Sequence, residues 1–133
     1  TFGILTFALA LTAGAFELTV LGHHSFSAQY DADQPVTLTG AVTKIEWMNP
    51  HVYFYIDVRD GDTRRVENWA LEMGAPAVIQ RRGWRQNTMK IGDLVTVEAS
   101  RAKNGAPHAN ARSVTMANTG VQLGTGSSEG LTP

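Results

Sequence analysis

Histidine is the residue type in this chain best suited to chemistry at a defined site. The chain has four histidines, His23, His24, His51 and His108, and a neutral imidazole is a good ligand for copper, zinc or nickel. His23 and His24 are adjacent, and His51 follows a predicted turn at Asn49-Pro50. The pattern therefore indicates one candidate site, at which His23, His24 and His51 bind copper or zinc.

The histidines are also open to a structural interpretation. Their spacing contains no HxH or HExxH motif, and a histidine after a turn can equally cap that turn by hydrogen bonding. If the chain were cleaved after Gly22, the α-amine of His23 would join its ring as a copper ligand. No sequence around Ser25 or Ser113 resembles a nucleophile elbow. We therefore expect no catalytic residues and no enzymatic activity.

Composition narrows the class of protein further. The chain has 133 residues, of which 43% are hydrophobic, with 11 Lys+Arg, 12 Asp+Glu and no cysteine. This length suits one domain. A formal net charge of -1 gives no general electrostatic attraction for phosphates, so we expect no nucleic-acid partner. Disulfides and thiolate metal sites are excluded because the chain lacks cysteine.

The first 22 residues are almost entirely apolar, with Glu17 as their one charge. A helix over 1–22 approaches the thickness of the bilayer hydrocarbon, so the segment predicts a single transmembrane helix or an uncleaved signal anchor. A cleaved signal peptide is the alternative. Because no Lys or Arg lies between residues 17 and 43, the rest of the chain is expected outside the cytoplasm.

The following residues show the alternation typical of β-strands. From Val36 apolar residues alternate with Thr and Ala, and the phase slips before Ile45, which indicates a bent strand with a bulge. The further predicted elements are strands near 51–58, 64–73, 94–100 and 109–117, with a helix over 75–82. This order is that of a mainly β, five-stranded OB-like barrel with one short helix, and a small sandwich is the competing fold.

The chain thus divides into four predicted segments: a transmembrane helix over 1–22, a linker over 23–35, the barrel over 36–117 and an extended tail over 118–133. The tail is rich in Gly, Ser and Thr, so alone it is expected to be disordered. We expect it to become ordered by lying along neighbouring chains.

Several segments together resemble a family of small exported bacterial proteins that is known only as a domain of unknown function. The segments are HHSF (23–26), YDADQPVTLTGAVTKIEWMNPH (30–51), NWALEMGAP (68–76), GW (83–84) and KIGDLVTVEASRAKNG (90–105). The resemblance covers about residues 23–116. It implies an OB-like barrel outside the cytoplasm and no assigned activity.

The sequence leaves three functions open. The first is a non-catalytic accessory subunit of a respiratory or photosynthetic membrane complex, anchored in the bacterial inner membrane by residues 1–22 with its domain in the periplasm. The second is a periplasmic copper- or zinc-binding protein that uses His23, His24 and His51. The third is a barrel that binds a small ligand.

Overall fold

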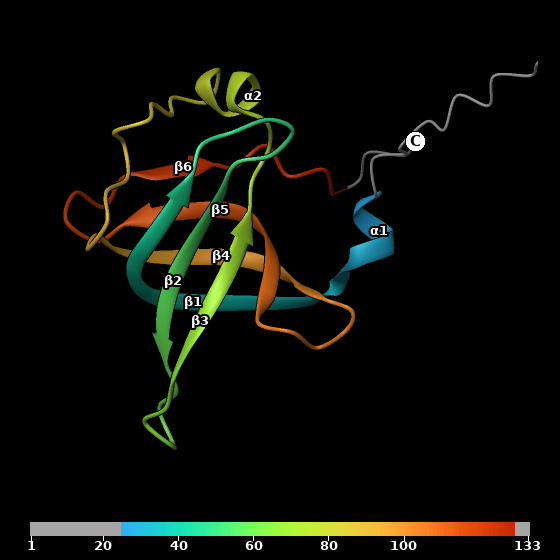
Figure 1. The fold of residues 1–133 in the computed structure, drawn as a ribbon, viewed down its shortest axis with the longest axis vertical. Coiled ribbons are helices and arrows are strands. Elements are labelled where there is room, and N and C mark those ends of the chain that lie inside the picture. Colours follow the sequence, from blue (N-terminus) through green and yellow to red (C-terminus); the bar gives the residue numbers. More distant parts are fainter. Residues whose placement is uncertain (1–24, 130–133) are drawn as a thin grey trace, which may run out of the picture.

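A computed structural model describes residues 25–129 as a mainly β fold (Figure 1). The predicted transmembrane segment, residues 1–22, lies outside the described residues, as do 130–133. Within residues 25–129, no helix has the length and apolar character needed to cross a membrane. The transmembrane assignment therefore stays a prediction.

The described residues form six strands and two short helices. In chain order the elements are α1 (Phe26–Gln29), β1 (Tyr30–Glu46), β2 (Tyr53–Arg59), β3 (Val66–Glu72), α2 (Pro76–Gln80), β4 (Leu94–Ala102), β5 (His108–Met116) and β6 (Gln122–Gly124). The predicted short helix between the third and fourth strands is confirmed as α2. Its start at Pro76 is favourable, because proline lacks only an N–H that has no partner in the first helical turn.

All six strands belong to one sheet, in the order β3-β2-β1-β4-β5-β6. In addition, β3 pairs in parallel with β5, with Ala70 opposite His108 and Glu72 opposite Asn110. The other neighbouring pairs are antiparallel. This extra pairing closes the first five strands into a ring of hydrogen-bonded strands, in the order β1-β2-β3-β5-β4. It also brings the end of β3 to the start of β5.

Strand β1 is long and bent, as its alternation pattern predicts. Its register against β2 shifts between Val42 and Lys44. Close strand packing also explains Gly40, because a Cβ atom there would lie 2.2 Å from the Asp57 carbonyl oxygen. The strand begins earlier than expected, at Tyr30, so residues 30–35 of the predicted linker belong to β1. Tyr30 is buried and lies opposite Ala102 of β4, which extends the pairing past the irregularity before Pro35.

One apolar core fills the interior of the ring of strands. Its largest fully buried side chains include Trp84, Phe54, Ile56, Leu71 and Ile79. Trp84 follows α2, and Ile79 is the buried residue of that helix. The alternating apolar positions of β2 thus face the core, while α2 and the segment after it cover one end of the ring (Figure 1).

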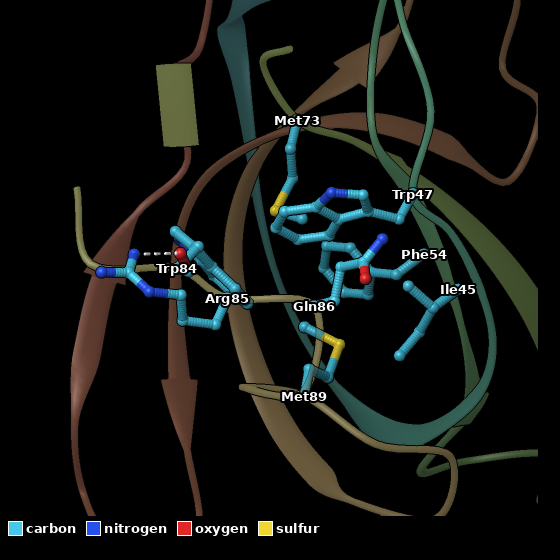
Figure 2. A pocket seen from close by; sticks show the side chains of 8 residues that line it. All are labelled: Ile45, Trp47, Phe54, Met73, Trp84, Arg85, Gln86 and Met89. Carbon is cyan, nitrogen blue, oxygen red and sulfur yellow. Dashed lines mark hydrogen bonds between the residues drawn. The ribbon is translucent and has the colours of Figure 1, made fainter. Parts of the chain in front are cut away.

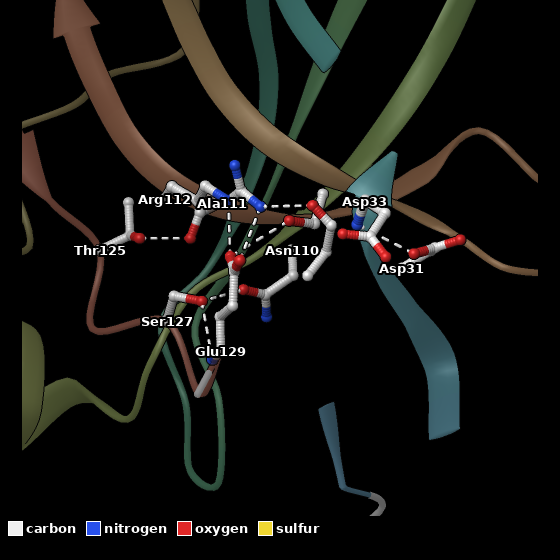
Figure 3. Close-up of polar contacts among 10 residues, drawn as sticks. Asp31, Asp33, Asn110, Ala111, Arg112, Thr125, Ser127 and Glu129 are labelled. Atoms are coloured by element: carbon white, nitrogen blue, oxygen red, sulfur yellow. Dashed lines mark hydrogen bonds and ion pairs between the residues drawn. The ribbon is translucent and has the colours of Figure 1, made fainter. Parts of the chain in front are cut away.

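The described part of the predicted tail, residues 118–129, packs against its own chain, whereas the sequence predicts a tail that is disordered on its own. Strand β6 pairs with β5, with Ser113 opposite Gly124, and Trp84 Nε1 donates a hydrogen bond to the Gly124 carbonyl at 2.9 Å. Figure 3 shows the polar contacts that continue this attachment through Thr125 and Glu129. The composition of the tail does not predict these contacts, because the partner residues lie elsewhere in the chain, on β5 and after α2.

Candidate functional site

A buried carboxylate at the end of β3 forms the most distinctive polar site of the described residues. Glu72 is 5% exposed, and its Oε2 accepts hydrogen bonds from two phenols, those of Tyr30 and Tyr53. The Tyr53 oxygen lies 2.8 Å from Oε2. A carboxyl oxygen can accept two hydrogen bonds, and charge-assisted bonds of this kind offset the free energy cost of burying a carboxylate.

The β3–β5 pairing brings His108 into the same group. His108 is the first residue of β5, and its Nε2 lies 2.7 Å from the Tyr30 hydroxyl. Because the Tyr30 proton is donated to Glu72, Nε2–H of His108 must be the donor to the Tyr30 oxygen. The two rings also meet edge to face, with centroids 5.2 Å apart and an interplanar angle of 81°.

His51 approaches Glu72 from the loop before β2. Its Nδ1 lies 3.1 Å from the Met73 carbonyl oxygen and 3.6 Å from Oε1 of Glu72. A carbonyl oxygen can only accept, so Nδ1 carries the proton. In the neutral ring, Nε2 therefore keeps its lone pair, and the imidazole is held in one tautomer and one orientation.

Together these side chains form what we call the Glu72 cluster, which consists of Tyr30, His51, Tyr53, Glu72 and His108. Burial raises the pKa of the Tyr30 and Tyr53 phenols well above the usual range, and the bond to Glu72 raises both further. Burial lowers the pKa of His108, although the charge of Glu72 opposes this shift. At neutral pH the phenols thus keep their protons and His108 stays uncharged.

Helix α1 packs directly against this cluster. The rings of Phe26 and Tyr30 lie 5.5 Å apart between centroids and form a small apolar group with Ala102. Lys103 also holds the helix, because its Nζ donates to the Ser27 carbonyl at 2.5 Å and its backbone N–H donates to the Gln29 carbonyl. Helix α1 is therefore fixed beside Tyr30.

Of the predicted metal ligands, the structure places His51 alone, since His23 and His24 lie outside the described residues. Within residues 25–129, no group of three or more His, Asp or Glu side chains is placed to hold a metal ion. The copper or zinc site at His23, His24 and His51 therefore stays a prediction. His108, the remaining histidine, lies with Tyr30 and not against the ring of His51.

A second feature is an apolar hollow at the end of the core that α2 covers. Trp47, Met73, Trp84 and Met89 are among the side chains that line it (Figure 2). Its volume of about 10 Å³ is far below the ~300–1,000 Å³ of typical ligand pockets. The hollow gives no support to the small-ligand alternative.

Sequence reasoning missed three members of the Glu72 cluster, namely Tyr30, Tyr53 and Glu72. The available signal was a single acid in the run WALEM (69–73), at a position that strand alternation after Trp69 would turn away from the core. Glu72 is buried nevertheless, because the phenols of Tyr30 and Tyr53 pack against it and bond to its carboxylate. The parallel pairing of β3 with β5 adds His108 to the same group. That pairing depends on residues more than 30 positions apart, so local pattern does not reveal it.

The fold and the site define a small β-sheet domain with a buried carboxylate, two phenols and two histidines at one end of its paired strands. The chain belongs to the family of unknown function DUF6152, whose match covers residues 11–111. This range includes the whole Glu72 cluster and ends within β5. No curated protein and no solved structure matches the chain significantly.

Proposed function

We propose that this chain is an exported copper- or zinc-binding protein in which His51 is a metal ligand through Nε2. The observation that carries the proposal is the hydrogen bond from Nδ1 of His51 to the Met73 carbonyl, with Glu72 next to it. Metal-binding histidines commonly donate their second ring N–H to a carbonyl or carboxylate, which orients the ring and makes it more basic. His51 has this arrangement before any metal binds.

His23 and His24 are the proposed additional ligands. They directly precede Ser25, and the chain after Ser25 is fixed against Tyr30 through Phe26. His51 contacts the same cluster through Glu72. The sequence separation between His24 and the anchored Phe26 is two residues, which spans at most about 7 Å of extended chain. The metal site would thus form where the N-terminal segment meets the cluster.

The test uses the full chain in mild detergent, titrated with Cu(II) and Zn(II) by calorimetry and checked by elemental analysis. We expect near-unit stoichiometry, and His51→Ala or His24→Ala should lower the affinity by at least about tenfold. His108→Ala is the matched control, because it removes a histidine of the cluster that the proposal does not use as a ligand. Absence of stoichiometric binding, or unchanged affinity in His51→Ala, would contradict the proposal.

A membrane-anchored, non-catalytic accessory subunit is the second candidate. The apolar segment 1–22 supports a location in the bacterial inner membrane with the domain in the periplasm. Large apolar side chains are also exposed at Ile91, Leu94 and Val121. Backbone bonds from Ala117 to the Leu94 carbonyl and from Met116 to the Val121 carbonyl place Leu94 and Val121 on either side of the end of β5. Such a patch suits contact with another subunit of a respiratory or photosynthetic complex.

Purification of the native protein in mild detergent tests this second candidate. Partner subunits should be recovered with the wild-type chain and lost with a Leu94→Lys, Val121→Lys double variant. Met48→Lys is the control, since Met48 is equally exposed but lies in the loop before β2. A chain that sediments alone under these conditions would contradict the subunit role and leave the metal proposal unaffected.

We further infer that the ring of strands is an OB-like barrel. The ring runs β1-β2-β3-β5-β4 and returns to β1, and α2 lies between β3 and β4 in the chain. These are the strand order and helix position expected of that fold. An experimental structure with hydrogen bonds between β3 and β5 absent would overturn this inference.

A further inference from the structure

Four side chains of the Glu72 cluster direct their polar atoms at one another. This quartet consists of Tyr30, Tyr53, Glu72 and His108. Glu72 Oε2 lies 2.8 Å from the Tyr53 oxygen, and the Tyr30 oxygen lies within hydrogen-bond distance of Oε2 and 2.7 Å from His108 Nε2. Three oxygen donors and one nitrogen donor from four different strands are thus gathered in a compact group.

The three oxygen donors bind hard, highly charged metal ions when deprotonated, and a neutral imidazole also suits iron. A carboxylate and two phenolates carry three negative charges together, and His108 is uncharged. A trivalent cation would neutralise this set, whereas a divalent cation would leave a net charge buried or one phenol protonated. Burying an uncompensated charge is costly, so charge balance favours a trivalent ion.

We propose that the quartet is a binding site for ferric iron, with the Tyr30 and Tyr53 phenolates, the Glu72 carboxylate and the His108 imidazole as ligands. Oxygen and imidazole donors suit iron, and tyrosinate is an established iron ligand in proteins. On binding, two Fe–O bonds form to the phenols and their two protons pass to solvent. Glu72 and His108 supply lone pairs, His108 in the tautomer with its proton on Nδ1, and no electron is transferred.

The hydrogen bonds of the metal-free protein hold the donors in place for this exchange. Donor atoms separated by 2.7 Å (Tyr30 and His108) and 2.8 Å (Tyr53 and Glu72) are spaced like neighbouring ligands around one small ion. The ion would thus bind beside these atoms after the two phenol protons have left. An entry route also exists, because His108 lines an open hollow of about 260 Å³ together with Gln29 and Lys103. The ligands of a metal site must be reachable as well as correctly spaced.

This site is distinct from the copper or zinc site proposed above. His51 contacts the other oxygen of Glu72, Oε1, and its Nε2 is not one of the quartet's donor atoms. The ferric site could therefore exist in a chain that binds neither copper nor zinc.

The test is titration of the full chain, in mild detergent, with ferric nitrilotriacetate. One iron should bind per chain, with a phenolate-to-iron charge-transfer band in the visible spectrum and tyrosinate ring modes in the resonance Raman spectrum. Tyr53→Phe should weaken the band to roughly half, since one phenolate remains, and a Tyr30→Phe, Tyr53→Phe double variant should abolish it. Iron that binds only at the surface would give no tyrosinate modes.

A matched control separates a metal site from a purely structural cluster. Tyr55→Phe removes the neighbouring phenol of β2, which bonds to Glu46, and should leave the band unchanged. Glu72→Gln and His108→Ala should each lower ferric affinity at least tenfold. Circular dichroism establishes that each variant is folded, and Tyr53→Phe alters only a half-buried hydroxyl. Absence of the band in the folded wild-type chain, or its persistence in the double variant, would overturn the proposal.

Discussion

Arg112 of β5 donates two hydrogen bonds to the Glu129 carboxylate, from Nε to Oε2 at 2.5 Å and from Nη2 to Oε1 at 2.7 Å. The same guanidinium donates to the Ala32 carbonyl in β1 at 3.0 Å. One side chain therefore joins the C-terminal segment to the beginning of the first strand (Figure 3). The bidentate geometry is the strong form of an arginine–carboxylate pair.

Replacing Arg112 by Ala should free the end of the C-terminal segment. We expect faster hydrogen exchange at residues 122–129 and a loss of about 1 kcal/mol in the free energy of unfolding, since the pair is partly exposed. Urea unfolding and exchange mass spectrometry measure the two effects. Arg59→Ala, at the exposed end of β2, is the control. Unchanged exchange in Arg112→Ala would show that the pair does not hold the segment.

Removing residues 118–133 should destabilise the whole domain, because the segment supplies partners for buried groups. Trp84 Nε1 would lose the Gly124 carbonyl, and the buried Asn110 would lose Ser127. Each unsatisfied buried polar group costs about 1–3 kcal/mol. A chain that lacks only 130–133 is the control. Equal melting temperatures for the two truncated chains would contradict this prediction.

Glu72→Gln should lower stability without any metal present. The Gln side chain would place a carbonyl or an NH2 group before two phenol donors, and hydrogen bonds to a charged acceptor contribute about 1.5–3 kcal/mol each. Glu67→Gln changes the same residue type at an exposed position of the same strand. Chemical unfolding of the three proteins compares them, and we expect the loss only in Glu72→Gln.

Gly40→Ala should be costly because the added Cβ would lie 2.2 Å from the Asp57 carbonyl oxygen, so β1 and β2 would have to separate. Overpacking of this kind costs about 1–3 kcal/mol or more. Gly61→Ala is a close control, because nothing lies within 4 Å of its added Cβ. If both variants unfold at the same urea concentration, the prediction that β1 and β2 approach too closely at Gly40 for a Cβ atom is wrong.

Asp60 should make the turn between β2 and β3 sensitive to acid. Its Oδ1 accepts hydrogen bonds from the N–H groups of Asp62 and Thr63 at 2.8 Å each, and these bonds lower the pKa of its carboxyl group. A lowered pKa in the folded state means that this contribution is present above the unfolded pKa of about 3.9 and is lost as the pH falls through the folded pKa. NMR shifts of the Thr63 amide should report the loss.

Asp62→Asn is the control for this pH dependence, because the Asp62 carboxylate accepts neither bond. Asp60→Asn should remove the acid-induced shift of the Thr63 amide, and Asp62→Asn should keep it. A shift that survives in Asp60→Asn would assign it to another group.

The strands could be predicted from sequence because their signals are local. Alternation from Val36 onward marks β1, and its slip before Ile45 marks the register shift between Val42 and Lys44. The helix after Ala75 has its proline at the start. By contrast, β6 has three residues, too few for a pattern, and it is a strand because β5 lies beside it.

The candidate site could be predicted far less well. Histidine chemistry pointed to His51, and the structure gives that residue oriented partners in Met73 and Glu72. Tyr30 and Tyr53 carry no distinguishing local signal, and the local signal of Glu72, a single acid in the run WALEM (69–73), does not reveal its partners. The cluster forms because the β3–β5 pairing joins segments that are distant in the chain. Composition and residue spacing do not predict such a pairing.

The position of β6 has a consequence for association between copies of the chain. On the edge that faces away from β4, β5 pairs with β3 over 108–110 and with β6 over 113–115. A three-residue strand therefore covers the stretch of β5 that β3 leaves unpaired. Exposed strand edges with free N–H and C=O groups readily add a strand from another molecule. The C-terminal segment thus covers an edge of β5 that could otherwise pair with another molecule, and its proteolytic removal should promote edge-to-edge aggregation.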